Sequence, residues 1–326
     1  MGKVYLIFTG GTISMKMDDL NHTVILALSA DDIMTALLAS FHECELETIE
    51  YAKLPSPSIT PSIMLDLSKL ISGLIEQENV SGVVLVHGTD VLEETAFFLD
   101  SVLKTKKPVV VTGSMKSSSD LGYDGINNLV SSILVCLSPD SNDKGVLVVM
   151  NDQINAASEV SKTNTLSLDT FKSLDYGPLG IVDNRQVIFY RSVNYLRPVI
   201  DTDHIEENVF LIKVYVGMDS KILFYLIDQL EAKGIVLEAL GRGNVPPMMI
   251  DGIKHALERH VPVVITSRCP SGRVLDTYGY EGGGNHLTSL GCIIAPNLNG
   301  QKARILLMIA LAKYHSPEKL KFVFMQ

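Results

Sequence analysis

Residues 81–100 most strongly limit how this chain can fold, because a polar segment there separates an apolar run from an amphipathic helix. Residues 83–86 are apolar and mostly β-branched, which is typical of a strand buried on both faces, and His87-Gly88-Thr89-Asp90 follows them. Helical spacing then begins, with Glu93 and Glu94 in the first turn, where carboxylates suit the helix dipole. We therefore expect Thr89 and Asp90 at the carboxyl end of a parallel strand, where open α/β sheets bind ligands, although either residue could simply cap the helix.

Strands alternate with helices along most of the chain, a pattern that predicts βαβ units and a mostly parallel sheet. In the first part, strands are predicted near 4–8, 47–53, 83–86, 108–112 and 145–150, and helices near 31–39, 61–77 and 126–137. In the last part, strands are predicted near 209–214, 234–237 and 261–266, before a helix near 302–311. The sequence thus predicts an α/β protein with a larger domain over 1–190, a linker over 191–207 and a smaller domain over 208–326. Residues 15–29 are predicted to form a mobile loop, and residues 151–190 to be less regular.

Charge and motif content argue against several classes of partner. The chain has no run of apolar residues long enough for a transmembrane helix, so no membrane partner is expected. Its net charge of −10 argues against non-specific nucleic-acid binding, and it lacks the glycine motifs of nucleotide cofactor sites. Four widely spaced cysteines predict free thiols and no metal site. The first residues lack a secretion-signal pattern, which predicts a cytoplasmic protein, or a periplasmic one if a leader has been removed.

Other polar loops follow predicted strands in the same way. Thr9-Gly10-Gly11-Thr12-Ile13 follows the first strand, and Thr112-Gly113-Ser114-Met115 follows the strand near 108–112. These two blocks and His87-Gly88-Thr89-Asp90 closely resemble the signature blocks of bacterial L-asparaginases. The resemblance covers nearly the whole chain, and the blocks occur in the same order. The further matching blocks are Glu93-Glu94-Thr95-Ala96, Asp124-Gly125 with Asn128-Leu129, Lys162-Thr163-Asn164, Tyr176-Gly177-Pro178-Leu179-Gly180 and Gln301-Lys302-Ala303-Arg304.

The resemblance implies the two-domain fold of that family, with a Rossmann- or flavodoxin-like smaller domain, and hydrolysis of L-asparagine without a cofactor. A hydroxyl nucleophile needs a proton acceptor within hydrogen-bond reach and donors for the oxyanion. Thr12 and Thr89 supply two hydroxyls, and Lys162 can act as the base once it has lost its proton. Asp90 could hold Lys162 or the α-amino group of the substrate.

Several residues of the first domain are expected to bind the substrate. Backbone N–H groups near Gly11 and Gly88 lie at glycine turns or helix starts, which accept carboxylates and oxyanions. The resemblance implies that Ser56 binds the substrate carboxylate, with Ser58 as the alternative because prolines interrupt this loop. Ser114 is a further candidate ligand, although a serine at a strand end can equally serve as a cap.

The resemblance also implies an assembly. In this family, residues of the second domain reach the site of a neighbouring subunit, so Asn244, and more loosely Glu281, are expected to contribute to a partner's site. We therefore expect a homotetramer built as a dimer of dimers.

One position departs from the family pattern. The family carries a catalytic tyrosine in the loop after Thr12, whereas residues 13–50 contain no tyrosine and Asn21-His22-Thr23 stands at that position. His22 could accept a proton near neutral pH or could be a solvated loop residue. Two alternatives to an L-asparaginase therefore stay open, namely an amidase for L-glutamine or a D-amide, and a catalytically silent asparagine sensor. Release of ammonia distinguishes the enzymes from the sensor.

Overall fold

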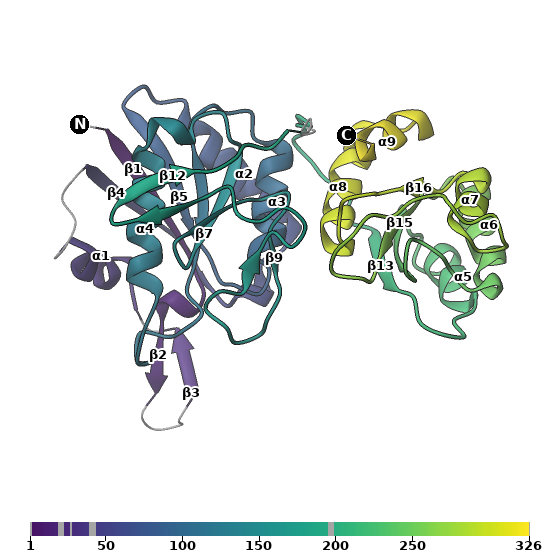
Figure 1. The fold of residues 1–326 in the computed structure, drawn as a ribbon, viewed down its shortest axis with the longest axis horizontal. Coiled ribbons are helices and arrows are strands. Elements are labelled where there is room, and N and C mark those ends of the chain that lie inside the picture. The colour runs from purple at the N-terminus through teal and green to yellow at the C-terminus, as the bar shows by residue number, and fades with distance from the viewer. Residues whose placement is uncertain (1, 19–22, 27, 39–43, 195–198, 326) are drawn as a thin grey trace. The chain divides into compact units, whose positions relative to one another are not determined.

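The computed structural model describes residues 2–18, 23–26, 28–38, 44–194 and 199–325, and the chain divides into two units, Met1–Asn194 and Tyr195–Gln326 (Figure 1). Each unit has its own sheet and its own hydrophobic core. Within the described residues, no helix has both the length and the apolar character needed to cross a membrane.

The first unit is built on an eight-stranded sheet in the order β12-β11-β8-β7-β6-β5-β1-β4. Its strands are β1 (Lys3–Gly10), β4 (Glu45–Leu54), β5 (Val80–Val86), β6 (Val109–Thr112), β7 (Val146–Met150), β8 (Gln153–Ala156), β11 (Gly180–Asp183) and β12 (Gln186–Phe189). The strands from β4 to β7 run parallel, as the sequence predicts. Strands β8, β11 and β12 join antiparallel at one edge, so the sheet is mixed and part of the region predicted to be less regular is strand.

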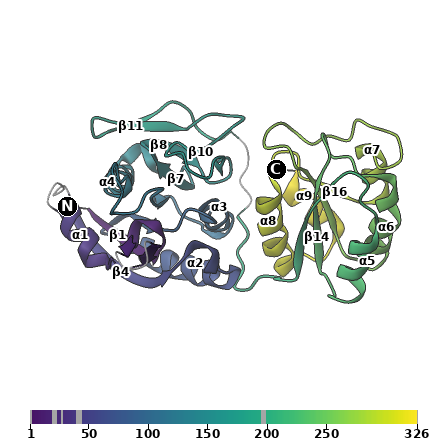
Figure 2. The ribbon, with the colours of Figure 1, turned by 90° about the horizontal axis from the view of Figure 1, so that it is seen from below.

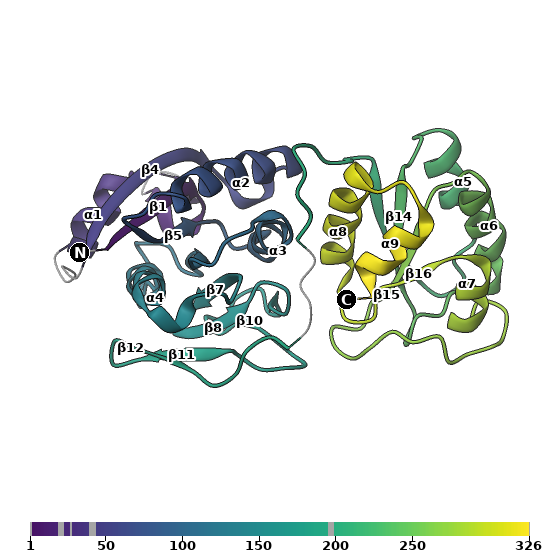
Figure 3. The ribbon, with the colours of Figure 1, turned by 90° about the horizontal axis from the view of Figure 1, so that it is seen from above.

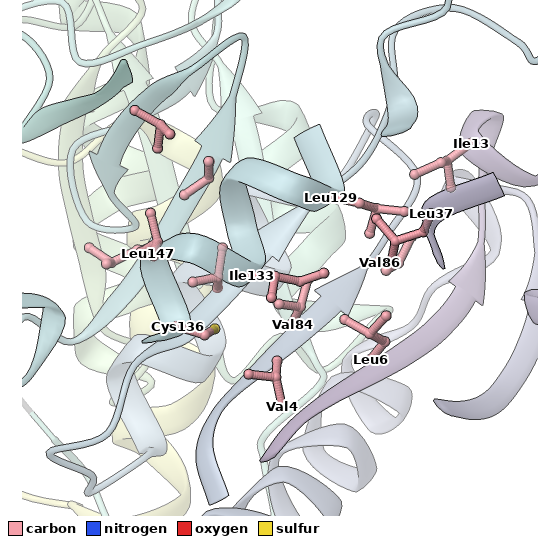
Figure 4. Packing of buried hydrophobic residues seen from close by; sticks show 14 of the residues in the cluster. Val4, Leu6, Ile13, Leu37, Val84, Val86, Leu129, Ile133, Cys136 and Leu147 are labelled. Atoms are coloured by element: carbon pink, nitrogen blue, oxygen red, sulfur yellow. The ribbon is translucent and has the colours of Figure 1, made fainter. Parts of the chain in front are cut away.

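Helices cover both faces of this sheet because its central strands are apolar on both sides. Helices α1 (Ala30–Leu38) and α4 (Gly125–Leu137) lie on one face, and α2 (Pro61–Ile75) and α3 (Leu92–Val102) lie on the other (Figures 2 and 3). The first unit has a hydrophobic core on each face of its sheet. Because side chains alternate along a strand, successive residues of β5 contribute to opposite faces. Val84 and Val86 pack with Leu129 and Ile133 of α4 (Figure 4), whereas Val83 and Leu85 pack on the side of α2 and α3.

The helix signal at Thr60-Pro61 is confirmed. The Thr60 side chain accepts a hydrogen bond from the N–H of Ile63, and Pro61 occupies the first position of α2. This cap fixes where the chain enters α2 after the short turn η2 (Ser56–Ser58), which lies beside the carboxyl end of β5.

The prediction of a loop over residues 15–29 is wrong for its described part. Residues Met15–Asp18 (β2) and Thr23–Leu26 (β3) pair as an antiparallel hairpin, and α1 begins at Ala30. Sequence periodicity did not predict the hairpin, because some of the hydrogen bonds that stabilise it come from residues about 100 positions later in the chain. Backbone and side-chain groups of Ser118 and Ser119 hydrogen-bond to the backbone of β2.

The second unit has a four-stranded parallel sheet in the order β13-β14-β15-β16. Its strands are β13 (Val209–Lys213), β14 (Gly234–Ala239), β15 (Val263–Ser267) and β16 (Ile293–Ile294), and its helices are α5 (Lys221–Asp228), α6 (Ile250–Glu258), α7 (Gly284–Leu290), α8 (Gly300–Lys313) and α9 (Pro317–Phe324). Figure 3 shows α8 on one side of β14 and β15 and α5 and α6 on the other. This layered arrangement of parallel strands and helices is the α/β class that the alternating pattern predicts.

A fully buried histidine, His87, directly follows the carboxyl end of β5. The Nδ1 atom of His87 donates to the carbonyl oxygen of Gly88 at 2.7 Å, and its Nε2 atom accepts from the Thr95 hydroxyl at 3.0 Å. Burial lowers the pKa of His87 to about 4, so the imidazole is neutral in the folded protein near neutral pH. An unfolded chain would protonate the same histidine near pH 6.5.

The depressed pKa of His87 predicts a loss of stability in acid. Between pH 6.5 and 4 the unfolded state binds a proton that the folded state excludes, so the free energy of unfolding falls as pH falls, by ~3 kcal/mol over this window. His87→Leu removes this contribution, and its melting temperature should fall less steeply over the same interval than that of the wild type. His315→Leu, at an exposed histidine, is the matched control. Parallel slopes for the wild type and His87→Leu would contradict the assignment.

Candidate active site

Neighbouring strand ends of the first unit bring the glycine loops into contact. Gly11 has φ 83°, a left-handed conformation that favours glycine, and a Cβ atom there would overlap the backbone of Gly88. A Cβ at Gly88 would in turn overlap the side chain of Ser56, and a Cβ at Gly113 would overlap the carbonyl oxygen of His87. The loops after β1, β4, β5 and β6 therefore meet at one edge of the sheet, which is where α/β sheets bind ligands.

An amine, a hydroxyl and a carboxylate form the centre of this edge. The Nζ atom of Lys162 lies 2.9 Å from Oγ1 of Thr89 and 2.9 Å from Oδ1 of Asp90. Thr89 is buried, the Lys162 side chain is 17% exposed and the Asp90 side chain is 57% exposed, so the group lies at the border with solvent. Thr89 and Asp90 follow β5, and Lys162 ends the short strand β9 (Ser161–Lys162), which pairs with β10 (Phe171–Lys172). This arrangement lets a lysine 72 positions away meet the Asp90 carboxylate.

A buried glutamate supports the backbone at Lys162. Oε1 of Glu93 accepts the N–H of Lys162 at 3.2 Å, and Glu93 is 6% exposed. The sequence predicts only a favourable interaction of this carboxylate with the dipole of α3, and it contains no sign of a partner on β9. Glu93 therefore links the helix that follows Thr89 to the strand that carries Lys162.

The two serines of the proline-containing loop have different surroundings. Ser56 is buried, its hydroxyl donates to the carbonyl oxygen of Gly88 at 2.8 Å, and it accepts the N–H of Val91 at 3.1 Å. Ser58 is exposed. The structure thus brings Ser56, and not Ser58, against the loop that carries Thr89.

The loop after β6 is organised by one carboxylate. Asp124 accepts hydrogen bonds from the hydroxyl of Ser114 at 2.7 Å, the N–H groups of Met115 and Lys116, and the side-chain amide of Asn128. Four donors on one carboxylate hold the loop in a single arrangement. Asp124 and Asn128 belong to a block of the family pattern, but only the structure indicates that they hold Ser114 in place.

The remaining predicted residues are Thr12 of the first unit, Asn244 and Glu281 of the second unit, and His22. Thr12 directly follows Gly11 and opens the short turn η1 (Thr12–Ser14), where it is partly exposed. His22 lies outside the described residues. Asn244 and Glu281 belong to the second unit, where Oδ1 of Asn244 accepts the N–H of Gly284 at 3.3 Å and Glu281 is exposed.

The cluster has the parts of an acyl-transfer site. A threonine hydroxyl contacts an amine that can take its proton, and a carboxylate orients that amine, as in other nucleophile–base–carboxylate sets. Backbone N–H groups at the adjacent glycine turns can stabilise a negatively charged oxygen.

Comparisons with known proteins identify the family of this chain. Residues 3–195 match the family described as "Asparaginase, N-terminal", and residues 208–324 match the "Glutaminase/Asparaginase C-terminal domain". The L-asparaginase of Bacillus licheniformis is 35% identical over 323 residues, covering 99% of both chains. L-asparaginase 2 of Escherichia coli K12 is 30% identical, covering 99% of this chain and 92% of that protein.

A solved structure has the same fold over the whole chain. The crystal structure of a probable cytoplasmic L-asparaginase from Campylobacter jejuni superposes with a TM-score of 0.90 at 31% identity, and the match covers 100% of both chains. Because both domain families match and a relative at 35% identity aligns over 99% of both chains, the chain belongs to the asparaginase family.

Proposed function

We propose that this protein is an L-asparaginase, an amidohydrolase that converts L-asparagine to L-aspartate and ammonia through a threonine nucleophile. The observation that carries the proposal is the 2.9 Å contact of Lys162 Nζ with both Thr89 Oγ1 and Asp90 Oδ1. The names of the full-length relatives support the substrate. The description of the C-terminal family also includes glutaminases, which makes L-glutamine the second substrate to test.

The reaction is an acyl transfer in two additions. A threonine hydroxyl adds to the side-chain amide carbon of asparagine, the C–N bond breaks, and ammonia leaves with the proton that the hydroxyl gave up. Water then adds to the resulting ester and releases aspartate and the free hydroxyl. Lys162, neutral when it accepts a proton, carries that proton between Thr89 and the leaving group or water, and Thr12 supplies the second hydroxyl.

The substrate's charged ends have matching groups on the same edge. Asp90 is exposed enough to accept the α-ammonium group while it holds Lys162. Ser56 meets the α-carboxylate when its proton turns from the Gly88 carbonyl toward the substrate, and the exposed Ser58 is not needed. Backbone N–H groups near Gly11 and Gly88 stabilise the oxyanion, with Ser114 at the border of the site.

The Lys162 assignment is tested by Lys162→Met, measured with L-asparagine, L-glutamine and D-asparagine. We expect the wild type to release ammonia fastest from L-asparagine, and the variant to lose kcat by about a hundred- to ten-thousandfold with a small change in KM, because a base acts in the transition state. Lys172→Met, on the paired strand β10 and in an exposed ion pair with Asp169, is the matched control. A pure KM effect would make Lys162 a binding residue, and asparagine binding without ammonia release by the wild type would favour a sensor.

The two threonines are distinguished by the amount of ammonia that each variant releases. Ammonia leaves in the first addition, so the variant that lacks the attacking hydroxyl should release none. The variant that lacks the hydroxyl needed for water attack should release about one equivalent per site and stop. Thr12→Val and Thr89→Val, which keep the shape of the side chain, should therefore differ in a rapid-quench ammonia assay. Near-normal turnover of both variants would refute the threonine mechanism.

We also propose that the protein is a homotetramer built from dimers, in which each site is shared between two subunits. Apolar side chains are exposed on the second unit, around the turn after β13, helix α5 and the turn η4 (Pro247–Met249), including Val216 at 91% and Met248 at 62%. The Ser220 hydroxyl donates to the Met248 carbonyl, so these segments are adjacent. An exposed apolar patch of this kind is typical of a protein interface.

Subunit complementation tests the shared site. Lys162→Met and Asn244→Ala chains should each be nearly inactive as pure assemblies. After mixing and refolding, about a quarter of the wild-type activity should return, because half of the random dimers are mixed and each has one intact site. Lys162→Met mixed with Asp90→Asn is the control, since both changes lie on the first unit and no site is restored. No recovery in the first mixture would remove Asn244 from the partner's site.

A cytoplasmic location is supported by the description of the Campylobacter relative as a probable cytoplasmic L-asparaginase. A relative from Haemophilus influenzae is described as probably periplasmic, so the family includes both compartments. The role of His22 as a proton acceptor stays a prediction.

A further inference from the structure

The turn that carries Thr12 depends on a second loop for its hydrogen bonds. The Gly11 carbonyl accepts the N–H of Ser14 within η1, but the Ile13 carbonyl accepts the Tyr123 hydroxyl at 2.9 Å. The Met15 carbonyl accepts both the N–H and the hydroxyl of Ser118, at 3.1 Å and 2.9 Å. Because buried carbonyl groups need partners, the loop between β6 and α4 helps to fix the path of the chain after Thr12, together with the N–H of Leu28, which donates to the Ser14 carbonyl.

That supporting loop is itself held firmly. Its Asp124 carboxylate accepts the four hydrogen bonds described above, and Asp120 accepts the N–H and the hydroxyl of Ser117, both at 2.8 Å. The N–H of Tyr123 donates to the carbonyl of Asp120 at 3.2 Å. The Tyr123 hydroxyl is thus presented by a segment whose polar groups are already paired.

The ring of Tyr123 packs in a defined position. It packs at the edge of the hydrophobic core that contains Ile13 and Leu129, and Figure 4 shows these two side chains in the same cluster. A Cβ atom at Gly125 would overlap the Tyr123 hydroxyl and ring, although the backbone of Gly125 is helical and does not require glycine. Burial raises the pKa of Tyr123, so its phenol stays protonated and donates to the Ile13 carbonyl.

We propose that Tyr123 is a positioning residue for Thr12. Its hydroxyl fixes the carbonyl of the residue directly after Thr12, and with it the orientation of η1 and the direction in which the Thr12 side chain leaves the backbone. Within the described residues the Thr12 hydroxyl has no hydrogen-bond partner, so no polar contact of its own holds it in place and its position depends on the backbone of η1. The inference rests on the proposed function, which gives Thr12 a part in the chemistry.

Tyr123→Phe tests the inference with the loss of one oxygen atom. Because a small misplacement of a reacting group slows a reaction without weakening binding, we expect kcat to fall about tenfold while KM stays within about twofold. The melting temperature should change by no more than about 3 °C, since the ring and its packing remain. Tyr5→Phe is the matched control, because Tyr5 is a tyrosine of β1 whose hydroxyl contacts Gln77 at 3.4 Å.

Gly125→Ala provides an independent perturbation of the same contact. Alanine is well suited to a helix, so a lower kcat would come from the displaced Tyr123 and not from the backbone. In the Tyr123→Phe background, Gly125→Ala should then reduce kcat by a smaller factor than in the wild type. Equal factors in the two backgrounds would overturn the role of the hydroxyl.

The outcomes separate this inference from the proposed function. If Thr12→Val is inactive and Tyr123→Phe has normal kcat, the positioning role is wrong and the threonine mechanism stands. If Tyr123→Phe lowers kcat, raises KM and lowers the melting temperature together, Tyr123 is a general structural residue and the inference is overturned. If Thr12→Val turns over normally, the assignment of Thr12 fails, and with it the reason for Tyr123 to affect kcat.

Discussion

The contact between the backbones of Gly11 and Gly88 is the constraint on which the candidate site depends. Neighbouring strands lie about 4.8 Å apart, so loops that leave β1 and β5 side by side converge only where no side chain stands between them. With both positions occupied by glycine, Thr12 and Thr89 follow directly on adjacent loops, and Ser56 can pack against Gly88. The close approach of two main chains therefore brings two threonines to the same edge of the sheet.

Polar groups around this contact are satisfied by partners that hold them in place. Ser56 bridges the Gly88 carbonyl and the Val91 N–H, and Glu93 accepts the N–H of Lys162. Asp124 gathers four donors from its own loop and from α4. Such paired networks are rigid, and a rigid surround is what keeps reacting groups at a productive distance. Flexible lysine and aspartate side chains thereby meet at hydrogen-bond distance.

Local signals in the sequence were enough to predict the parallel core of the first sheet, the start of α2 after the Thr60 cap and the α/β class. The hairpin of β2 and β3 and the antiparallel strands β8, β11 and β12 were not predicted, because each of these strands is only four residues long and gives too little alternation to be distinctive. In the same way, short blocks indicated Thr89, Asp90 and Lys162 as candidates, and their catalytic roles stay predictions. The supporting contacts of Glu93 and Tyr123 link residues 69 and 110 positions apart, a separation at which periodicity carries no information.

Lys162 belongs to β9, which pairs only with β10, and each of these strands is two residues long; neither is a strand of the main sheet. The loop between them closes on itself, since Thr163 and Asn164 exchange hydrogen bonds with Thr170. The candidate base is thus held by this small hairpin and by the Glu93 contact, whereas Thr89 follows a parallel strand of the main sheet. Phe171 of β10 is buried in the core on the side of α2 and α3, so the hairpin is anchored to the first unit while the amine of Lys162 extends to Thr89. The position of the amine therefore depends on a segment outside the main sheet, and a change in the loop between β9 and β10 can shift it without a change in the strand that leads to Thr89.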